Sequence, residues 1–486
     1  MTKELRRLSI ILLVMFLALF ASTSVIQVVQ AETLAQNPMN KRALYDSFDV
    51  QRGSIIASGS AIASSVPSHD IYTWQRQYVD PKMWAPVTGY INPVLQSSWP
   101  GIEQSMNQQL SGTGSSQFFA RVERIVSGQP PRGSNVVLSL DAAVQKVAYD
   151  ALGKLQGAVV AIEPKTGRIL AMVTSPSYDT NKLASHDAAA VDKEYKALND
   201  DPTQPMANRA IGGNMNPPGS TFKLVTVSAA LASGEFTPTS KLPNLATYIL
   251  PGTSQPIHND TGGTCGPGKE VTIADALRLS CNIPMAELAV KVGHDRMQQE
   301  AQKYGFDSAF EMPVKSTPST YPRVASPDRV ALSGFGQGDV RATPLQMAMV
   351  SAGIANGGVV MKPRMVDQVV GPDLSVQQTY QSEQFDRSLE SNLNSQMVAM
   401  MVANVSRGIA TNARIDGVEV AGKTGTAQNG ENQPYSLWFT GFAPAEDPQV
   451  AVAVVVENGG GNGQESVGNQ IAAPIAKKVM EAVLGK

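Results

Sequence analysis

The longest apolar run of the chain lies at its N-terminus. Residues 8–29 are mostly apolar, and three basic residues precede them. About 20 helical residues at 1.5 Å each can cross a bilayer, and the basic flank predicts that residues 1–7 form a cytoplasmic tail. We therefore predict a transmembrane anchor and an exported remainder. A cleaved signal peptide is the alternative, because polar residues interrupt the second half of the run and Val29-Gln30-Ala31 is similar to a cleavage site.

A cluster of turn-forming residues divides the exported part. Residues 127–134 read Ser-Gly-Gln-Pro-Pro-Arg-Gly-Ser, a composition that interrupts helices and strands. Before this cluster the chain is polar, rich in Ser and Gln, and without a pattern that predicts individual elements. We predict a smaller N-terminal domain at residues 30–134 and a larger domain at residues 135–486.

Regular hydrophobic patterns begin after this boundary. Residues 136–140 suit a strand, and Asp141 can cap the amphipathic helix that follows. Apolar runs at 158–162 and 168–173 flank a turn that contains Pro and Gly, which predicts a β-hairpin. A long section with helical patterns follows.

Three further strands are predicted near the C-terminus. Residues 418–427, 436–442 and 449–457 are joined by short connections, as neighbouring antiparallel strands would be. An amphipathic helix at about 471–484 follows them. With the hairpin, these runs predict an α+β fold in which helices cover an antiparallel sheet of about five strands.

Composition narrows the possible functions. Among 486 residues, 39 basic and 41 acidic side chains give a net charge of -2, which offers no reason to bind nucleic acid. The scattered histidines and cysteines lack zinc-site spacing, so we expect no metal and no other cofactor. In an exported domain Cys265 and Cys281 could close a loop of about 16 residues, and we predict a disulfide. Two buried free thiols are the alternative.

The first candidate for catalysis lies at a predicted helix start. Ser220 and Lys223 are three residues apart, so on a helix the amine can reach the hydroxyl. A neutral lysine in a partly desolvated site can take the proton of a serine and make it nucleophilic. Unpaired N–H groups at the helix start could stabilise a developing oxyanion. Alone, the pair also fits an ordinary capped helix.

A second short motif is Ser280-Cys281-Asn282. It follows a helical pattern at 272–279 and precedes Pro284, which predicts a turn between two helices. Simple helix capping is the better explanation of this tripeptide when it is considered alone.

A third motif lies in the predicted strand at 418–427. There Lys423 would supply positive charge, and Thr424 and Thr426 could donate hydrogen bonds to an anionic group. Gly425 leaves room for a substrate to pair with the backbone. An exposed turn is the simpler alternative.

Taken in order, the motifs S-x-x-K, S-x-N and K-T-G are the signature of the penicillin-binding protein and serine β-lactamase superfamily. The exported chain resembles the class B penicillin-binding proteins over nearly its whole length, and Cys281 within the second motif is similar to actinobacterial members. A glycosyltransferase domain does not fit in the residues upstream. Further matching segments are Arg52-Gly53-Ser54-Ile55-Ile56, Gly157-Ala158-Val159-Val160, Asn208-Arg209-Ala210 and Gly336-Gln337-Gly338.

The resemblance implies a monofunctional D,D-transpeptidase that cross-links peptidoglycan stems and is acylated by β-lactams. It implies that Ser220 is the nucleophile and Lys223 its base, while Ser280 and Lys423 relay a proton. Asn282 would bind the donor peptide. Substrate contacts are implied for Thr424, Gly425 and Thr426, with the backbone N–H groups of Ser220 and Thr426 as the oxyanion hole.

The resemblance also implies a place in the cell. We expect a single-pass membrane protein with an extracytoplasmic catalytic domain, working at the division septum as a monomer. Its expected partners are stem peptides of the lipid-linked precursor or nascent glycan, together with a membrane glycosyltransferase and division proteins.

Other functions share these motifs. A D,D-carboxypeptidase or β-lactam-hydrolysing relative uses the same groups, although Glu194 and Leu198-Asn199 precede Ser220 at the wrong spacing for a class A β-lactamase. A β-lactam sensor or assembly scaffold without turnover is the non-enzymatic alternative.

Overall fold

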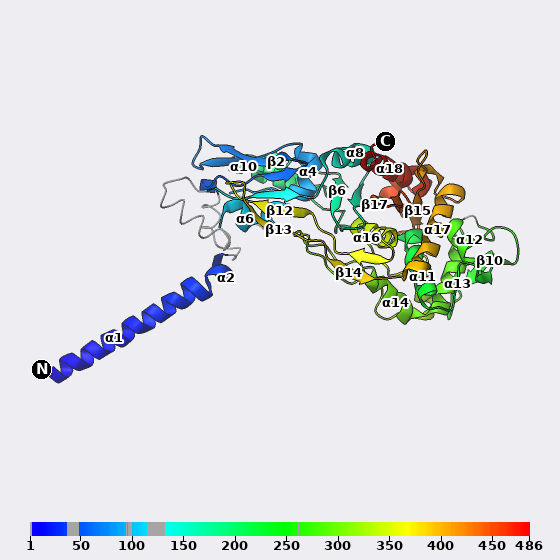
Figure 1. Ribbon diagram of the computed structural model, residues 1–486, viewed down its shortest axis with the longest axis horizontal. Coiled ribbons are helices and arrows are strands. Elements are labelled where there is room, and N and C mark those ends of the chain that lie inside the picture. The colour runs from blue at the N-terminus through cyan, green and yellow to red at the C-terminus, as the bar shows by residue number, and fades with distance from the viewer. Residues whose placement is uncertain (1, 36–47, 94, 96–99, 114–131, 261) are drawn as a thin grey trace.

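The computed structural model describes residues 2–35, 48–93, 95, 100–113, 132–260 and 262–486. The helix α1 (Thr2–Ser24) continues into a π-helical turn, η1 (Val25–Val29), and extends away from the body of the molecule (Figure 1). This exposed apolar helix is long enough to span a membrane, as predicted. A short helix, α2 (Ala31–Ala35), follows it. Residues 127–131 of the predicted boundary lie outside the described residues.

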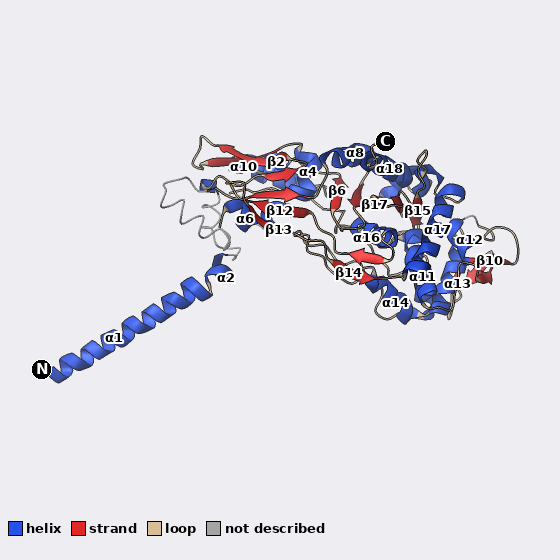
Figure 2. Cartoon of the chain, viewed as in Figure 1, coloured by secondary structure: helices blue, strands red, loops and turns tan. Residues whose placement is uncertain are grey.

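A six-stranded sheet forms the part of the body nearest to α1 (Figures 1 and 2). Its strand order is β13-β12-β4-β1-β2-β3, and only the β1/β4 pair among its described strands is parallel. The six strands come from three separate parts of the chain. They are β1 (Ile55–Ala57), β2 (Ser60–Pro67), β3 (Trp74–Tyr78), β4 (Asn135–Leu138), β12 (Val366–Val370) and β13 (Val376–Thr379).

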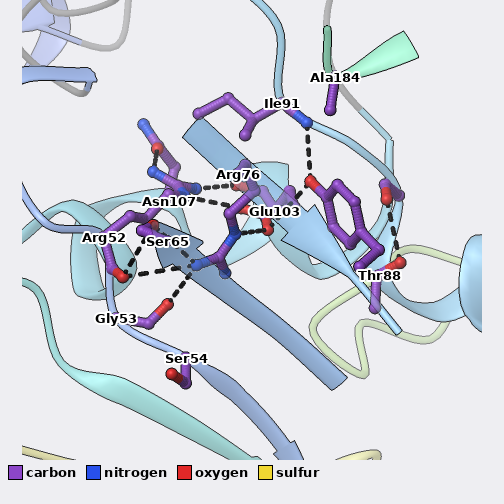
Figure 3. Close-up of polar contacts among 12 residues, drawn as sticks. Arg52, Gly53, Ser54, Ser65, Arg76, Thr88, Ile91, Glu103, Asn107 and Ala184 are labelled. Carbon is purple, nitrogen blue, oxygen red and sulfur yellow. Dashed lines mark hydrogen bonds and ion pairs between the residues drawn. The ribbon is translucent and has the colours of Figure 1, made fainter. Parts of the chain in front are cut away.

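Buried charges lie against this sheet, beside the helices α4 (Pro81–Thr88), α5 (Gly101–Ser105) and α6 (Asn107–Ser111). Figure 3 shows Arg52 and Arg76 converging on the carboxylate of Glu103, at 2.6 and 2.7 Å. Tyr78 donates to the same carboxylate, and Asn107 accepts from Arg52. Burial alone would raise the pKa of Glu103, but the two guanidinium groups hold it below its ordinary value.

The predicted five-stranded antiparallel sheet is confirmed in the larger part of the body. Its order is β15-β16-β17-β5-β6, and both of its faces are covered. Alternate residues of β5 enter opposite cores, with Val159 on the side of α8 and α18 and Val160 on the other. The strands are β5 (Gly157–Ile162), β6 (Ile169–Ser175), β15 (Ala421–Ala427), β16 (Ser436–Ala443) and β17 (Val450–Val456).

The predicted helices at the two ends of this domain are also present. Asp141 caps α8 (Ala142–Leu152) by accepting from the N–H groups of Ala143 and Val144. The closing helix α18 (Gly468–Val483) starts earlier than predicted. The remaining helices are α9 (Thr180–Leu183), α10 (Ala188–Asp200), α11 (Lys223–Ala232), α12 (Ile273–Arg278), α13 (Asn282–Val292), α14 (His294–Lys303), α15 (Pro327–Ser333), α16 (Pro344–Ala355) and α17 (Ser391–Arg407).

Short elements complete the fold. Three small antiparallel pairs join β7 with β10, β8 with β9, and β11 with β14. These strands are β7 (Lys241–Pro243), β8 (Thr247–Ile249), β9 (Pro256–His258), β10 (Glu270–Thr272), β11 (Val359–Met361) and β14 (Gln384–Arg387). The 3-10 turns are η3 (Gly219–Phe222), η4 (Thr411–Ala413) and η5 (Asn458–Gly461).

Candidate active site

The predicted nucleophile lies on a tight turn against the edge of the five-stranded sheet. Ser220 is in the 3-10 turn η3, and the α-helix begins only at Lys223, so the predicted helix start is corrected. In a 3-10 turn residues three apart still lie on the same face, which keeps the two side chains neighbours. Gly219 has φ +53°, and a Cβ there would lie 2.9 Å from the Cβ of Ala427. Glycine therefore lets the turn approach β15.

Lys223 points from this turn into the interior. Its fully buried ammonium group donates to the backbone oxygen of Ser280 at 2.7 Å and to Oδ1 of Asn282 at 2.8 Å. Because burial removes water from the charged form, the pKa of Lys223 falls to about 7. The amine can therefore be neutral near neutral pH, as a general base must be.

Ser280 joins the two lysines of the site. Its hydroxyl oxygen lies 2.6 Å from Nζ of Lys423 and 3.4 Å from Nζ of Lys223. The residue has φ +59°, and it occupies the predicted turn between α12 and α13. Next to it, the predicted disulfide between Cys265 and Cys281 is confirmed, with Cα atoms 5.7 Å apart.

Lys423 reaches the same point from β15, an edge strand of the sheet. It is fully buried and also donates to the backbone oxygen of Thr424 at 2.8 Å. Burial lowers its pKa well below the usual value, and the positive charge of Lys223 lowers it further. The hydroxyl of Thr424 is buried without a hydrogen-bond partner in the described part of the chain. That of Thr426 accepts from the N–H of Gly468 at 3.3 Å.

Four of the predicted side chains thus form one hydrogen-bonded cluster: Lys223, Ser280, Asn282 and Lys423. Ser220 lies one turn before Lys223, but within the described residues its hydroxyl makes no hydrogen bond. The predicted contact between Ser220 and Lys223 is therefore not made in this conformation. Catalytic hydrogen bonds often form only when the substrate is bound.

Sequence reasoning missed Asp260, which lies in the loop after β9. Its Oδ1 accepts from Nδ2 of Asn282 at 2.8 Å, and its negative charge opposes the fall in the pKa of both lysines. The adjacent Asn259 accepts from the N–H groups at the start of α13. No spacing in the sequence points to Asp260, because the fold of the loop brings it to the motif.

Metal ligands are scarce around these groups. Within the residues that the structure describes, no group of three or more His, Cys, Asp or Glu side chains could hold a metal ion.

Comparison with known proteins explains this arrangement. Residues 157–481 match the family described as the penicillin binding protein transpeptidase domain. Over the full chain, the peptidoglycan D,D-transpeptidase PbpA of Mycolicibacterium smegmatis is 38% identical, with 99% of that relative covered. The chain belongs to the class B penicillin-binding proteins. The predicted family is confirmed.

Other comparisons refine this placement within the penicillin-binding proteins. Residues 52–136 match the penicillin binding protein A dimerisation domain. The Mycobacterium tuberculosis PbpA is 36% identical over 100% of this chain and 99% of the relative. Penicillin-binding protein A of M. tuberculosis, solved as a ceftriaxone acyl-enzyme complex, has a TM-score of 0.86 and 37% identity, covering 90% of this chain and 100% of that one. The predicted similarity to actinobacterial members is confirmed.

Proposed function

We propose that this penicillin-binding protein is a peptidoglycan D,D-transpeptidase that acts through an acyl-enzyme on Ser220. The observation that carries the proposal is the cluster of Lys223, Ser280 and Lys423 beside the Ser220 turn, at the edge of β15. The buried amines of Lys223 and Lys423 have lowered pKa values, and the hydroxyl of Ser280 lies between them. These three groups can pass a proton to and from Ser220. The name of the relatives and their β-lactam acyl-enzyme structures support the same activity.

Acylation begins when Lys223 takes the proton of the Ser220 hydroxyl. The Ser220 oxygen then attacks the carbonyl carbon between the two D-alanines of the donor stem, and the carbonyl oxygen becomes an oxyanion. The backbone N–H groups of Ser220 and Thr426 stabilise that charge. A proton passes through Ser280 to the nitrogen of the terminal D-alanine, the C–N bond breaks, and D-alanine leaves.

Deacylation runs through the same groups in reverse. An amine of a neighbouring stem attacks the ester carbon, its proton returns through the cluster, and Ser220 is released as the new amide forms. Lys423, Thr424 and Thr426 hold the terminal carboxylate of the donor, and the buried Thr424 hydroxyl is suited to this because it lacks another partner. Asn282 holds the donor backbone. A β-lactam acylates Ser220 and stalls at the ester.

The protein is membrane-anchored through its N-terminal helix. We propose that residues 1–7 are cytoplasmic, residues 8–29 span the membrane, residues 30–134 form a non-catalytic domain and residues 135–486 carry catalysis outside the cytoplasm. Work at the septum on lipid-linked precursor or nascent glycan, beside a membrane glycosyltransferase and division proteins, belongs to the same proposal. The monomeric state stays a prediction.

Labelling with fluorescent penicillin tests the nucleophile. Ser220→Ala should abolish labelling, while its melting temperature stays within about 2 °C of wild type, because a hydroxyl without a hydrogen bond adds little stability. Labelling that persists in this variant would remove the mechanism. Incubation of wild type with a donor stem and an amine acceptor should give cross-linked product, and hydrolysis alone would favour the carboxypeptidase alternative.

A further inference from the structure

A polar pocket lies beside the nucleophile turn and takes no part in the cluster described above. It has a volume of about 400 Å³, and its lining residues include Asn216, Gln337, Arg341 and Gln428. The amide group of Asn216 is already bonded to Glu457 and Ser436. Among the described lining residues Arg341 is the only charged one, and none is acidic. The described lining of the pocket therefore carries one positive charge and no negative charge.

The backbone and one guanidinium nitrogen of Arg341 are hydrogen-bonded, while two other guanidinium nitrogens have no partner among the described residues. Its backbone exchanges two hydrogen bonds with Thr320, and its Nη1 donates to the backbone oxygens of Gly338 and Val340, both at 2.8 Å. In the described part of the chain its Nε and Nη2 have no partner, and no carboxylate pairs with it. These two nitrogens form the side of a guanidinium that binds a carboxylate through two parallel hydrogen bonds.

Two segments that line the pocket adjoin the active-site elements in the chain. Asn216 lies four residues before Ser220, and the N–H of Gly219 donates to the oxygen of Gly336, next to Gln337, at 3.0 Å. Gln428 follows the last residue of β15, and the side-chain amide of Gln337 pairs with its backbone N–H and C=O at 2.9 and 3.2 Å. A molecule in the pocket would therefore touch the extension of the substrate-binding strand.

The direction of the donor peptide tells which part of it reaches the pocket. In the proposed function the terminal carboxylate lies near Lys423 and Thr424, and the scissile carbonyl lies near Thr426. A chain that continues along the strand passes Gln428 about 7 Å farther on, since a strand rises about 3.3 Å per residue. The pocket thus lies beside the second or third donor residue upstream of the scissile bond.

We propose that this pocket binds a carboxylate carried by the donor stem upstream of the scissile bond, with Arg341 as the residue that pairs with it. The inference rests on the proposed function, because the direction of the donor follows from it. Arg341 is a specificity-determining residue rather than a member of the proton path, so its loss should weaken recognition of acidic donors and spare the chemistry.

Two matched cephalosporins test this. Both carry an aminothiazole oxime side chain, which takes the place of the upstream donor, and only one has a carboxylate on the oxime. Arg341→Gln should lower the second-order acylation constant about 5- to 10-fold for the acidic compound and change it less than about 2-fold for the other. Arg341→Lys, which keeps the charge without the fork, should fall between.

The controls distinguish a failure of the proposed carboxylate site from a failure of the proposed function. Arg323→Gln removes an exposed arginine outside the pocket and should leave both constants unchanged. Equal losses for the two compounds, or no loss, in a folded Arg341→Gln variant would overturn the carboxylate site. If neither compound acylates the wild-type protein, the proposed function itself fails.

Discussion

Two clusters of buried cationic side chains among the described residues differ in how their charges are balanced. Near the six-stranded sheet, Arg52 and Arg76 share the carboxylate of Glu103, with side chains no more than 3% exposed (Figure 3). Both guanidinium groups make further hydrogen bonds, to Asn107 and to backbone oxygens. Each guanidinium group is therefore paired with a carboxylate oxygen at short range.

At the five-stranded sheet, Lys223 and Lys423 meet with only neutral groups in hydrogen-bonding contact. The acidic group that acts on them, Asp260, is exposed and bonds to Asn282 instead. Without a paired carboxylate the lysines lose their charge more readily, and their pKa values fall. Burial with a charged partner keeps a cationic side chain charged, while burial without one favours the neutral amine.

The largest effect should come from removing one amine of the unpaired cluster. Lys223→Ala deletes the proposed base, so the second-order constant for penicillin acylation should fall about 1,000-fold or more at neutral pH. Lys146→Ala, which removes an exposed lysine on α8, is the matched control and should behave as wild type. Near-normal acylation of Lys223→Ala would assign the base elsewhere and end the contrast between the two clusters.

The paired cluster should respond in stability rather than in chemistry. Glu103→Gln leaves two guanidinium groups buried without their carboxylate, which should reduce the free energy of unfolding of the N-terminal domain by about 3–5 kcal/mol in urea titrations. Because the pKa of Glu103 is lowered in the fold, its stabilisation is present above the unfolded pKa and is lost as the pH falls.

An exposed pair provides the comparison for that measurement. The side chains of Glu235 and Arg296 are 53% and 48% exposed. Glu235→Gln removes their ion pair and should lower the free energy of unfolding by less than about 1 kcal/mol. A Glu103→Gln variant as stable as Glu235→Gln would show that the buried carboxylate is dispensable.

The smallest effect should be a change in pH dependence at Asp260. In wild type, acylation should rise with pH through a midpoint of about 7, as Lys223 loses its proton. Asp260→Asn keeps an acceptor for Asn282 but removes the negative charge that favours the ammonium form, so the midpoint should move to lower pH. The pH profile of the acylation constant measures this shift.

Asp295→Asn removes a carboxylate that is 92% exposed on α14 and serves as the control. Its profile should match that of wild type. A midpoint that stays in place or rises in Asp260→Asn would contradict the electrostatic role of Asp260.

The five-stranded sheet and the three motifs could be predicted because their signals are local. A strand buried on both faces is a continuous apolar run, as in Val450–Val456, and each motif combines residue types whose chemistry is restrictive. The cysteine pair was also predicted correctly from an exported context. What the sequence could not show was the 3-10 geometry of the Ser220 turn, which packing against β15 imposes.

The N-terminal sheet could not be predicted for a different reason. Ile55–Ala57 has only three residues, Ser60–Pro67 consists mainly of small residues such as Ser and Ala, and neither has a strong alternating pattern. Their sheet also includes Val366–Val370, about 300 residues away in the chain, and no local signal reports such a pairing. Asp260 and Arg341 could not be predicted as site residues for the same reason, because each contacts residues that are distant in the sequence.

The shared six-stranded sheet has a structural consequence. The chain passes between the two sheets three times: after β4, before β12 and after β13. The N-terminal strands are therefore connected to the rest of the molecule by more than one linker. The parallel ladder of β1 with β4 lies just before α8, because β4 leads directly into that helix. Loss of β1 would therefore leave the backbone groups of β4 unpaired on that side, at the strand that leads into the five-stranded part of the molecule.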